Sequence, residues 1–196
     1  MKLTYTKTTT EEKNRIEVWH DQFALSPRDE EYTDGNLGYF ITKEKSYESP
    51  DTNEELQNIM ERTAEEATDT QNHMELIKAE YKDIVYIEPV YRYEHGNVKY
   101  SRGTAGGFDS SNCGFYIVTK KTLERTGTET KDFDSAIDAE LETYTAYANG
   151  ETYGITIYDE DGEVQEQQGN FFSIEDMYDG LPKEFDGVDL HDYLTS

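Results

Sequence analysis

The carboxylates of the C-terminal third are the side chains of this 196-residue sequence whose number and spacing are most suggestive of chemistry. The segment GETYGITIYDEDGEVQEQQG, residues 150–169, contains six acidic residues and no lysine or arginine. From Glu129 to Ser196 there are 19 acidic and two basic residues, a net charge of −17. Carboxylates at this density can coordinate calcium or present negative charge to a basic partner.

The calcium interpretation depends on the stretch DEDGE, residues 159–163. An EF-hand loop requires a ligand at its first position and a helix on either side. When the pattern is aligned on Gly162, Ile157 occupies that first position and cannot coordinate a metal ion. The stretch is better explained as a hairpin turn at Asp161-Gly162, so the sequence predicts no metal site.

A second group of candidates comprises His95, Asp109 and Cys113, whose side chains can build a nucleophilic site. Their spacing matches no thiol-enzyme signature. The nearby glycine-rich segment GTAGGFDSSNCG, residues 103–114, fits neither phosphate-binding loop pattern, and no cofactor is predicted. The alternative hypothesis is a small enzyme that acts on a nucleotide-like or small-molecule substrate around His95 and Asp109.

The overall composition favours a folded acidic protein. Forty-three acidic residues against 18 basic ones leave a net charge of −25, which repels nucleic acid and acidic membranes and attracts basic surfaces. The 16 tyrosines, 8 phenylalanines and single tryptophan predict an aromatic core. The single cysteine cannot form an internal disulfide, and no apolar stretch approaches the length that spans a membrane.

Part of the negative charge is expected to follow one predicted helix, residues 132–150. Asp134, Asp138 and Glu142 recur every four residues, about 6 Å apart along the helix, beside a core face of Phe133, Ile137, Leu141, Tyr144 and Ala148. Like charges at this spacing destabilise a helix, which favours a binding role, although a merely solvated face is the competing interpretation. The predicted acidic binding surface consists of Asp132, Asp134, Asp138, Glu140, Glu142, Glu151, Asp159, Glu160, Asp161, Glu163 and Glu166.

The remaining patterns predict the elements that position these side chains. Strands are expected at 15–21, 37–43, 84–94, 98–104, 115–121 and, as a hairpin, 152–172. The segment 49–81 is helical, as one helix or two, with Thr52 and Glu55 as a capping box. A short helix is expected at 173–180. The fold class is α+β, a single domain in which an antiparallel sheet packs with two or three helices. The domain is predicted to span residues 14–181, between a flexible N-terminal tail, 1–13, and an acidic C-terminal tail, 182–196.

Several motifs resemble those of a family of small acidic hypothetical proteins carried by phages and other mobile elements. They include Ser26-Pro27-Arg28, Asn36-Leu37-Gly38, the turn from Tyr91 to Gly96, Phe108-Asp109-Ser110, the strand from Gly114 to Val118, Glu140-Glu142-Thr143-Tyr144, and Gly150 to Gly154. The resemblance covers about two thirds of the chain. It implies a phage or mobile-element protein in the cytoplasm of a bacterial host, and it implies no mechanism.

Charge and resemblance together predict a phage-borne inhibitor of a bacterial defence nuclease, of the anti-restriction or anti-CRISPR type. Such nucleases hold nucleic acid in positively charged channels. The −17 of the C-terminal third corresponds to roughly eight or nine base pairs of duplex phosphate. The protein is expected to act as an acidic nucleic-acid mimic and not as an enzyme. Its partner would be a basic nucleic-acid-binding host protein, a nuclease, without direct contact to nucleic acid or membrane.

Overall fold

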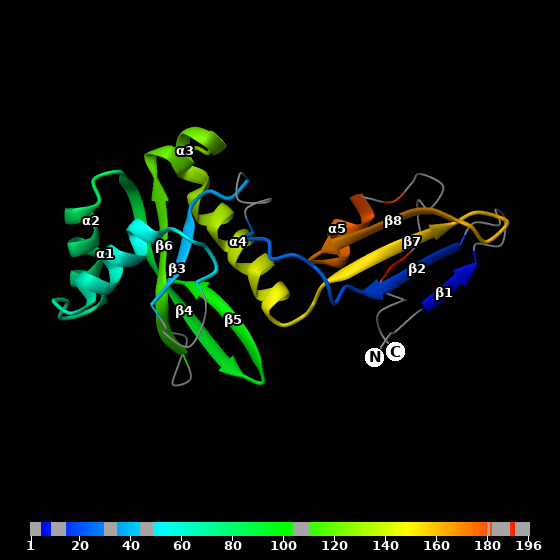
Figure 1. The fold of residues 1–196 in the computed structure, drawn as a ribbon, viewed down its shortest axis with the longest axis horizontal. Coiled ribbons are helices and arrows are strands. Elements are labelled where there is room, and N and C mark those ends of the chain that lie inside the picture. The colour runs from blue at the N-terminus through cyan, green and yellow to red at the C-terminus, as the bar shows by residue number, and fades with distance from the viewer. Residues whose placement is uncertain are drawn as a thin grey trace. The chain divides into compact units, whose positions relative to one another are not determined.

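The computed structural model describes residues 5–8, 15–29, 35–43, 49–103, 110–179, 181 and 189–190 (Figure 1). The expected α+β class with antiparallel pairing is confirmed. The described strands form two four-stranded sheets in place of the one sheet expected. The contacts within the chain divide it into two compact units. Unit 1 consists of Met1–Ser26 and Ala146–Ser196, and unit 2 of Pro27–Thr145, so the range 14–181 is shared between them.

Unit 1 contains a sheet with the strand order β1-β2-β7-β8. Its strands are β1 (Tyr5–Thr8), β2 (Arg15–His20), β7 (Tyr153–Tyr158) and β8 (Val164–Phe171). Each pairs antiparallel with its neighbour, so β2 and β7 lie side by side although they are far apart in the sequence (Figure 1). Residues 1–13 were expected to be a flexible tail, but β1 lies within them and pairs with β2.

The core of unit 1 lies on one face of this sheet. Alternation in β2 and β7 sends Ile16, Val18, Ile155 and Ile157 to that face, where they are buried. Met177 of the short helix α5 (Ile174–Asp179) packs against them, as does Leu190. Leu190 belongs to the segment predicted as an acidic C-terminal tail, while 182–188 and 191–196 lie outside the described residues.

The opposite face of the same sheet carries the single tryptophan. The indole of Trp19 lies against the backbone at Gly154, where an added Cβ would stand 2.3 Å from Cζ2 of the ring. Its Nε1–H donates a hydrogen bond of 3.1 Å to Oγ1 of Thr156 on β7. Glycine is required at position 154 because only a residue without a side chain leaves room for the ring.

Unit 2 is built on the second sheet, with the strand order β3-β6-β4-β5. Its strands are β3 (Tyr39–Thr42), β4 (Ile84–His95), β5 (Asn97–Arg102) and β6 (Ser110–Thr119). Helices α1 and α2 cover one face and α4 the other (Figure 1). The central strand β6 is therefore buried on both faces from Cys113 to Thr119, which explains its continuous apolar run.

The helical segment 49–81 contains two helices, α1 (Glu54–Ala64) and α2 (Thr70–Glu80). The side chain of Asn53 caps α1 by accepting a hydrogen bond from the Leu56 amide, so the expected cap at Thr52 is wrong by one residue. Asp69 caps α2 in the same way through the Asn72 amide. A capping side chain in the middle of the segment starts a second helix instead of continuing the first.

Two elements between 105 and 132 differ from expectation. No strand was expected between residues 104 and 115, but β6 begins at Ser110. The strand predicted over 115–121 ends at Thr119, whose hydroxyl caps helix α3 (Lys120–Thr126) in a capping box with Thr122. A reciprocal cap of this kind outweighs the strand preference of the preceding residues.

Helix α4 (Phe133–Ala148) follows a single 3₁₀ turn, Thr130–Asp132. The predicted core positions Phe133, Ile137 and Leu141 are buried, and Tyr144 packs against the same cluster, whereas Ala148 is exposed. The helix ends where Gly150 takes a positive φ of 71°, which confirms the predicted stop. No helix among the described residues is both long and apolar enough to cross a membrane.

Candidate functional site

The predicted acidic surface is divided between the two units. Five of its carboxylates, Asp132 to Glu142, belong to unit 2 and stand on or just before α4. The other six, Glu151 to Glu166, belong to unit 1 and stand on or near the β7–β8 hairpin. Each group is therefore considered by itself.

Glu140 does not belong to an exposed surface, and its assignment as a binding residue is corrected. Its Oε1 accepts a hydrogen bond of 2.6 Å from the Leu37 amide. Its Oε2 accepts hydrogen bonds of 2.5 Å from Nη1 of Arg28 and from the hydroxyl of Tyr116. The side chain is only 15% exposed, because position 140 lies seven residues after Phe133 and so falls on the same, inward face of α4.

Arg28 is the centre of this buried network. Its side chain is 2% exposed and donates to both carboxylate oxygens of Asp51 and, at 2.7 Å, to the carbonyl of Gly38. Burial alone would lower the pKa of Arg28, but the adjacent charge of Asp51 and its hydrogen bonds raise it above the ordinary value. Burial also raises the pKa of the Tyr116 hydroxyl, assisted by Glu140. The arrangement fixes β3, β6 and α4 to one another and leaves no reactive group exposed.

A second arginine lies over the row of carboxylates predicted on α4, Asp134, Asp138 and Glu142. Arg102, at the end of β5, donates to Asp138 through Nε to Oδ1 at 2.7 Å and through Nη2 to Oδ2 at 3.2 Å. Its Nη1 contacts Asp134 at 2.9 Å and Glu88 at 3.3 Å. The hydrogen bonds to Asp138 raise the pKa of Arg102. This row was expected to lack basic partners, but two of its three carboxylates, Asp134 and Asp138, are paired with Arg102.

In unit 2 the carboxylates of Asp134 and Asp138 are exposed but paired with Arg102, so Asp132 and Glu142 are the exposed members of the predicted surface that form no described ion pair. No described lysine or arginine lies within ion-pairing distance of Glu142. Two separated carboxylates do not form a dense acidic surface. The predicted acidic binding surface therefore depends on the carboxylates of unit 1.

In unit 1 the carboxylate of Asp159 has a structural task. Its Oδ1 accepts hydrogen bonds from the amides of Asp161 at 3.0 Å and Glu163 at 2.9 Å, and its Oδ2 accepts one from the Gln165 side chain. The hydrogen bond from the Glu163 amide is the main reason that the pKa of Asp159 is lowered. Gly162, with φ of 83°, completes the turn predicted at this position.

The turn that Asp159 holds together displays Glu160, Asp161 and Glu163, all exposed. Glu151, before β7, is exposed as well, while Glu166 on β8 is half-buried and accepts a hydrogen bond from the Gln168 side chain. Sequence reasoning left out three further exposed carboxylates on α5, which are Glu175, Asp176 and Asp179. Over residues 146–196 the sequence has 13 acidic residues and one lysine.

Comparison with known proteins adds no relative. No family model, no curated protein and no solved structure matches this chain.

The described residues of the alternative site around His95 do not lie close enough together to form a catalytic site. His95 ends β4 and is exposed, with its ring 6.5 Å from that of Tyr93. Cys113 is buried, and its thiol lies 3.4 Å from the carbonyl of Val90. Val90 precedes His95 by five residues, about 16 Å along the strand, so the thiol and the imidazole are not brought together. Asp109 lies outside the described residues.

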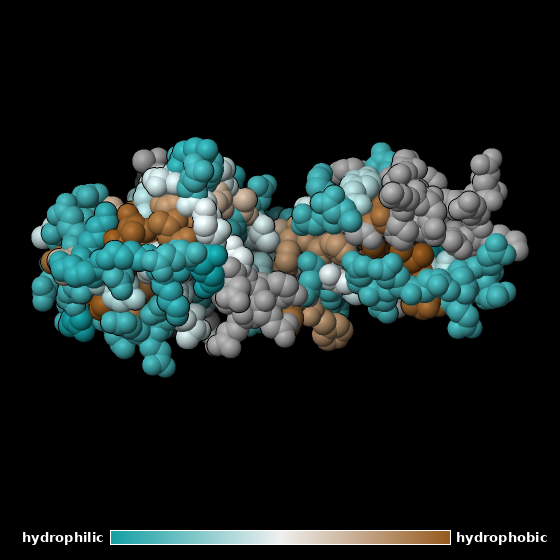
Figure 2. All heavy atoms as spheres, turned by 90° about the horizontal axis from the view of Figure 1, so that it is seen from above, coloured by the Kyte–Doolittle hydropathy of each residue, from teal (hydrophilic) through white to brown (hydrophobic). Residues whose placement is uncertain are grey.

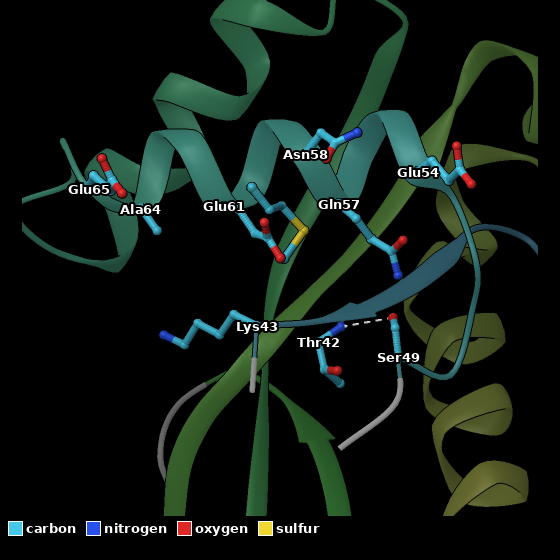
Figure 3. Close-up of a pocket in the computed structure, with 10 residues that line it drawn as sticks. Thr42, Lys43, Ser49, Glu54, Gln57, Asn58, Glu61, Ala64 and Glu65 are labelled. Carbon is cyan, nitrogen blue, oxygen red and sulfur yellow. Dashed lines mark hydrogen bonds between the residues drawn. The ribbon is translucent and has the colours of Figure 1, made fainter. Parts of the chain in front are cut away.

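Unit 2 also has an open hollow of about 660 Å³ between α1 and the end of β3 (Figure 3). Its lining combines Lys43 with the carboxylates of Glu54, Glu61 and Glu65, and its serine, Ser49, accepts a hydrogen bond of 3.2 Å from the Thr42 amide. Among the described residues, no group of three or more His, Cys, Asp or Glu side chains is arranged to hold a metal ion. The hollow offers polar contacts and no pair of nucleophile and base.

Proposed function

We propose that this chain is an inhibitor that binds the basic, nucleic-acid-binding surface of another protein, and that its unit 1 supplies the phosphate-like charge. The observation that carries the proposal is the segregation of charge in unit 1. Residues 1–26 have four acidic and four basic residues, whereas residues 146–196 have 13 acidic residues and one lysine. Residues 146–196 thus carry −12 in 51 residues, against −13 over the 119 residues of unit 2, so the negative charge is densest in this segment of the fold.

The arrangement of unit 1 supports this proposal. The turn with Glu160, Asp161 and Glu163 lies at one end of the β7–β8 hairpin, and α5 follows its other end. The six residues of β7 separate these ends by about 20 Å, the length of roughly six base pairs. Carboxylates held on a hydrogen-bonded frame over such a distance can occupy a channel lined with lysine and arginine without being a substrate.

The partner expected from the sequence is a bacterial defence nuclease, in keeping with the resemblance to proteins of phages and mobile elements. Restriction enzymes and RNA-guided nucleases have basic channels of the required kind. Like charge makes direct binding to nucleic acid unfavourable for a chain of −25. On the face shown in Figure 2, hydrophilic residues cover much of the described surface, and apolar residues show between them.

The proposal is tested on a panel of purified restriction and RNA-guided nucleases, with inhibition measured between about 50 and 200 mM salt. Affinity should fall by orders of magnitude over this range. Binding releases counterions from the charged surfaces, and this release becomes less favourable as the bulk salt concentration rises. The informative variant reverses Glu160, Asp161 and Glu163 to lysine and should abolish inhibition. The matched control reverses three exposed glutamates of unit 2, Glu61 of α1 and Glu65 and Glu66 just after it, which changes the net charge by the same amount. Equal losses in both variants, or inhibition independent of salt, would contradict the proposal.

A further inference from the structure

The loop that follows β2 displays two large apolar side chains to solvent. Phe23 is 91% exposed, more than any other large hydrophobic residue that the structure describes, and Leu25 is 41% exposed. Folding gains nothing from a phenylalanine in this position, since its ring is not removed from water. Isolated exposed apolar residues are common, so the exposure acquires meaning only from how the loop is held and what surrounds it.

The loop is held by hydrogen bonds to its own unit. Asp21, which is buried, accepts from the Phe23 amide through Oδ1 and from the Asn170 amide through Oδ2, both at 3.0 Å. The Asn170 side chain in turn accepts from the Leu25 amide at 2.9 Å. The backbone of Asn170 has a positive φ of 63°, a conformation that the surrounding hydrogen bonds maintain.

Thr152, directly before β7, holds the first residue of the loop in place. The Asp21 amide donates to the carbonyl of Thr152 at 2.8 Å, and the Thr152 hydroxyl donates to the carbonyl of Asp21 at 2.7 Å. Phe23 is therefore presented on a backbone that is already ordered. A side chain presented in this way loses little conformational freedom on binding, which is what an anchor at an interface requires.

The charges around this loop define its surroundings. Glu151, directly before Thr152, is exposed. Glu175 and Asp176, in the first turn of α5, are exposed and follow the end of β8 that Asn170 belongs to. Arg15 stands at the opposite end of β2. The apolar loop thus has exposed carboxylates beside it, at the end of the unit 1 sheet opposite the acidic turn.

We propose that Phe23 and Leu25 form an anchor that inserts into an apolar pocket rimmed by lysine and arginine on the protein partner. This inference rests on the proposed function and specifies the chemistry of that partner. A second copy of the chain fits worse, because it would bring together two molecules of −25, each with exposed carboxylates beside this loop. A partner whose pocket is surrounded by basic residues satisfies both the exposed ring and the adjacent carboxylates.

Site-specific crosslinking tests the occupant directly. Phe23→p-benzoylphenylalanine is produced in bacterial cells as part of the full chain, and Val85→p-benzoylphenylalanine is the matched control. Val85 is also an exposed apolar residue, 42% exposed, but it stands on β4 in unit 2, to which the proposed function assigns no contact. Irradiation should join position 23, and not position 85, to a basic protein that mass spectrometry identifies. Adducts with a second copy or with an acidic protein, equal adducts at both positions, or no adduct at position 23 would overturn the inference.

Affinity measurements with the identified, purified protein separate this inference from the proposed function. Phe23→Ala should weaken binding at least tenfold, as expected for a buried aromatic anchor, with unchanged thermal unfolding, whereas Val85→Ala in unit 2 should not weaken it. If Phe23→Ala binds like the wild type while lysines at 160, 161 and 163 abolish binding, the anchor is wrong and the proposed function stands. If only Phe23→Ala weakens binding and salt has no effect, the anchor stands and the acidic mimic is wrong.

Discussion

Arg102 on β5 binds Asp138 on α4 with two parallel hydrogen bonds, from Nε at 2.7 Å and from Nη2 at 3.2 Å. This pairing changes the meaning of the acidic row on α4, because one guanidinium also reaches Asp134 and Glu88. A row of carboxylates that looks uncompensated in the sequence is part of the contact between a strand and a helix. Bidentate pairing of this kind is among the stronger surface ion pairs.

Arg102→Gln should therefore lower the free energy of unfolding by about 1 kcal/mol, since the three carboxylates that it joins would then repel one another. Chemical denaturation in low salt measures the loss, and 1 M salt should reduce it by screening. Arg62→Gln is the control, because Arg62 forms an ion pair with Glu80 alone on the exposed surface of α1 and α2. An equal effect of the two substitutions would mean that the contacts of Arg102 to α4 stabilise the fold no more than an isolated surface ion pair does.

Glu140 and Glu142 stand two residues apart on α4, and the same neutral substitution should destabilise the protein at Glu140 and have little effect at Glu142. Glu140→Gln removes the charge that faces the buried Arg28 and Tyr116, and should cost about 3 kcal/mol. Glu142→Gln changes an exposed side chain and should alter stability by less than about 0.5 kcal/mol. Urea denaturation of both variants makes the comparison at equal net charge. Similar losses in the two would show that Glu140 is no more than a surface carboxylate.

The elements with local signals could be predicted from the sequence. The helix stop at Gly150 and the turn at Asp161-Gly162 depend on glycines with positive φ, and a glycine at the end of an apolar pattern marks such positions. The core face of α4 follows from the spacing of Phe133, Ile137 and Leu141 alone. The same spacing places Glu140 on the inward face, seven residues after Phe133, and this signal was available although it was not used.

The long-range pairs could not be predicted. Arg28 and Glu140 are 112 residues apart, and Arg102 and Asp138 are 36 apart, so no window of the sequence contains both partners. The strand β1 was not predicted for a related reason. Tyr5–Thr8 form a strand by pairing with β2, and this pairing is not visible in the sequence of β1 itself. Charge counts gave the sign and amount of charge in each segment, and only the tertiary structure shows which carboxylates are already paired.

His73 should make unit 2 sensitive to mild acid. It is 4% exposed, with Nε2 at 3.1 Å from both the Met60 carbonyl and the Thr63 hydroxyl, and its ring meets Phe115 edge-on. Burial lowers the pKa of His73 from its ordinary value of 6.5. The unfolded chain therefore takes up a proton first as pH falls, so stability should drop below about pH 6.5 until the lowered pKa is reached. The slope contributed by one such group is at most about 1.4 kcal/mol per pH unit.

Denaturation curves between pH 7.5 and pH 5, a range set by roughly the ordinary histidine pKa, measure this dependence. His73→Gln should remove that part of the pH dependence, at some cost in stability at every pH. His95→Gln is the control, because His95 is exposed at the end of β4. A wild type and a His73→Gln variant with parallel pH profiles would show that the buried imidazole does not carry the effect.

Asp159 and Asp161 provide the last comparison, between a carboxylate that builds the acidic turn and one that the turn displays. Asp159→Ala removes the acceptor of two backbone amides, so the turn should loosen and amide hydrogen exchange at 161 and 163 should accelerate. Asp161→Ala loses the same charge and should leave exchange unchanged. The pKa of Asp159 is lowered, so its contribution to stability is present above about pH 3.8 and is lost as pH falls through the lowered pKa. Asp159→Ala should show less of this acid sensitivity. If both variants bind the proposed partner equally, only the amount of charge matters for binding. If Asp159→Ala binds more weakly than Asp161→Ala, the partner requires the carboxylates in the geometry that the turn imposes.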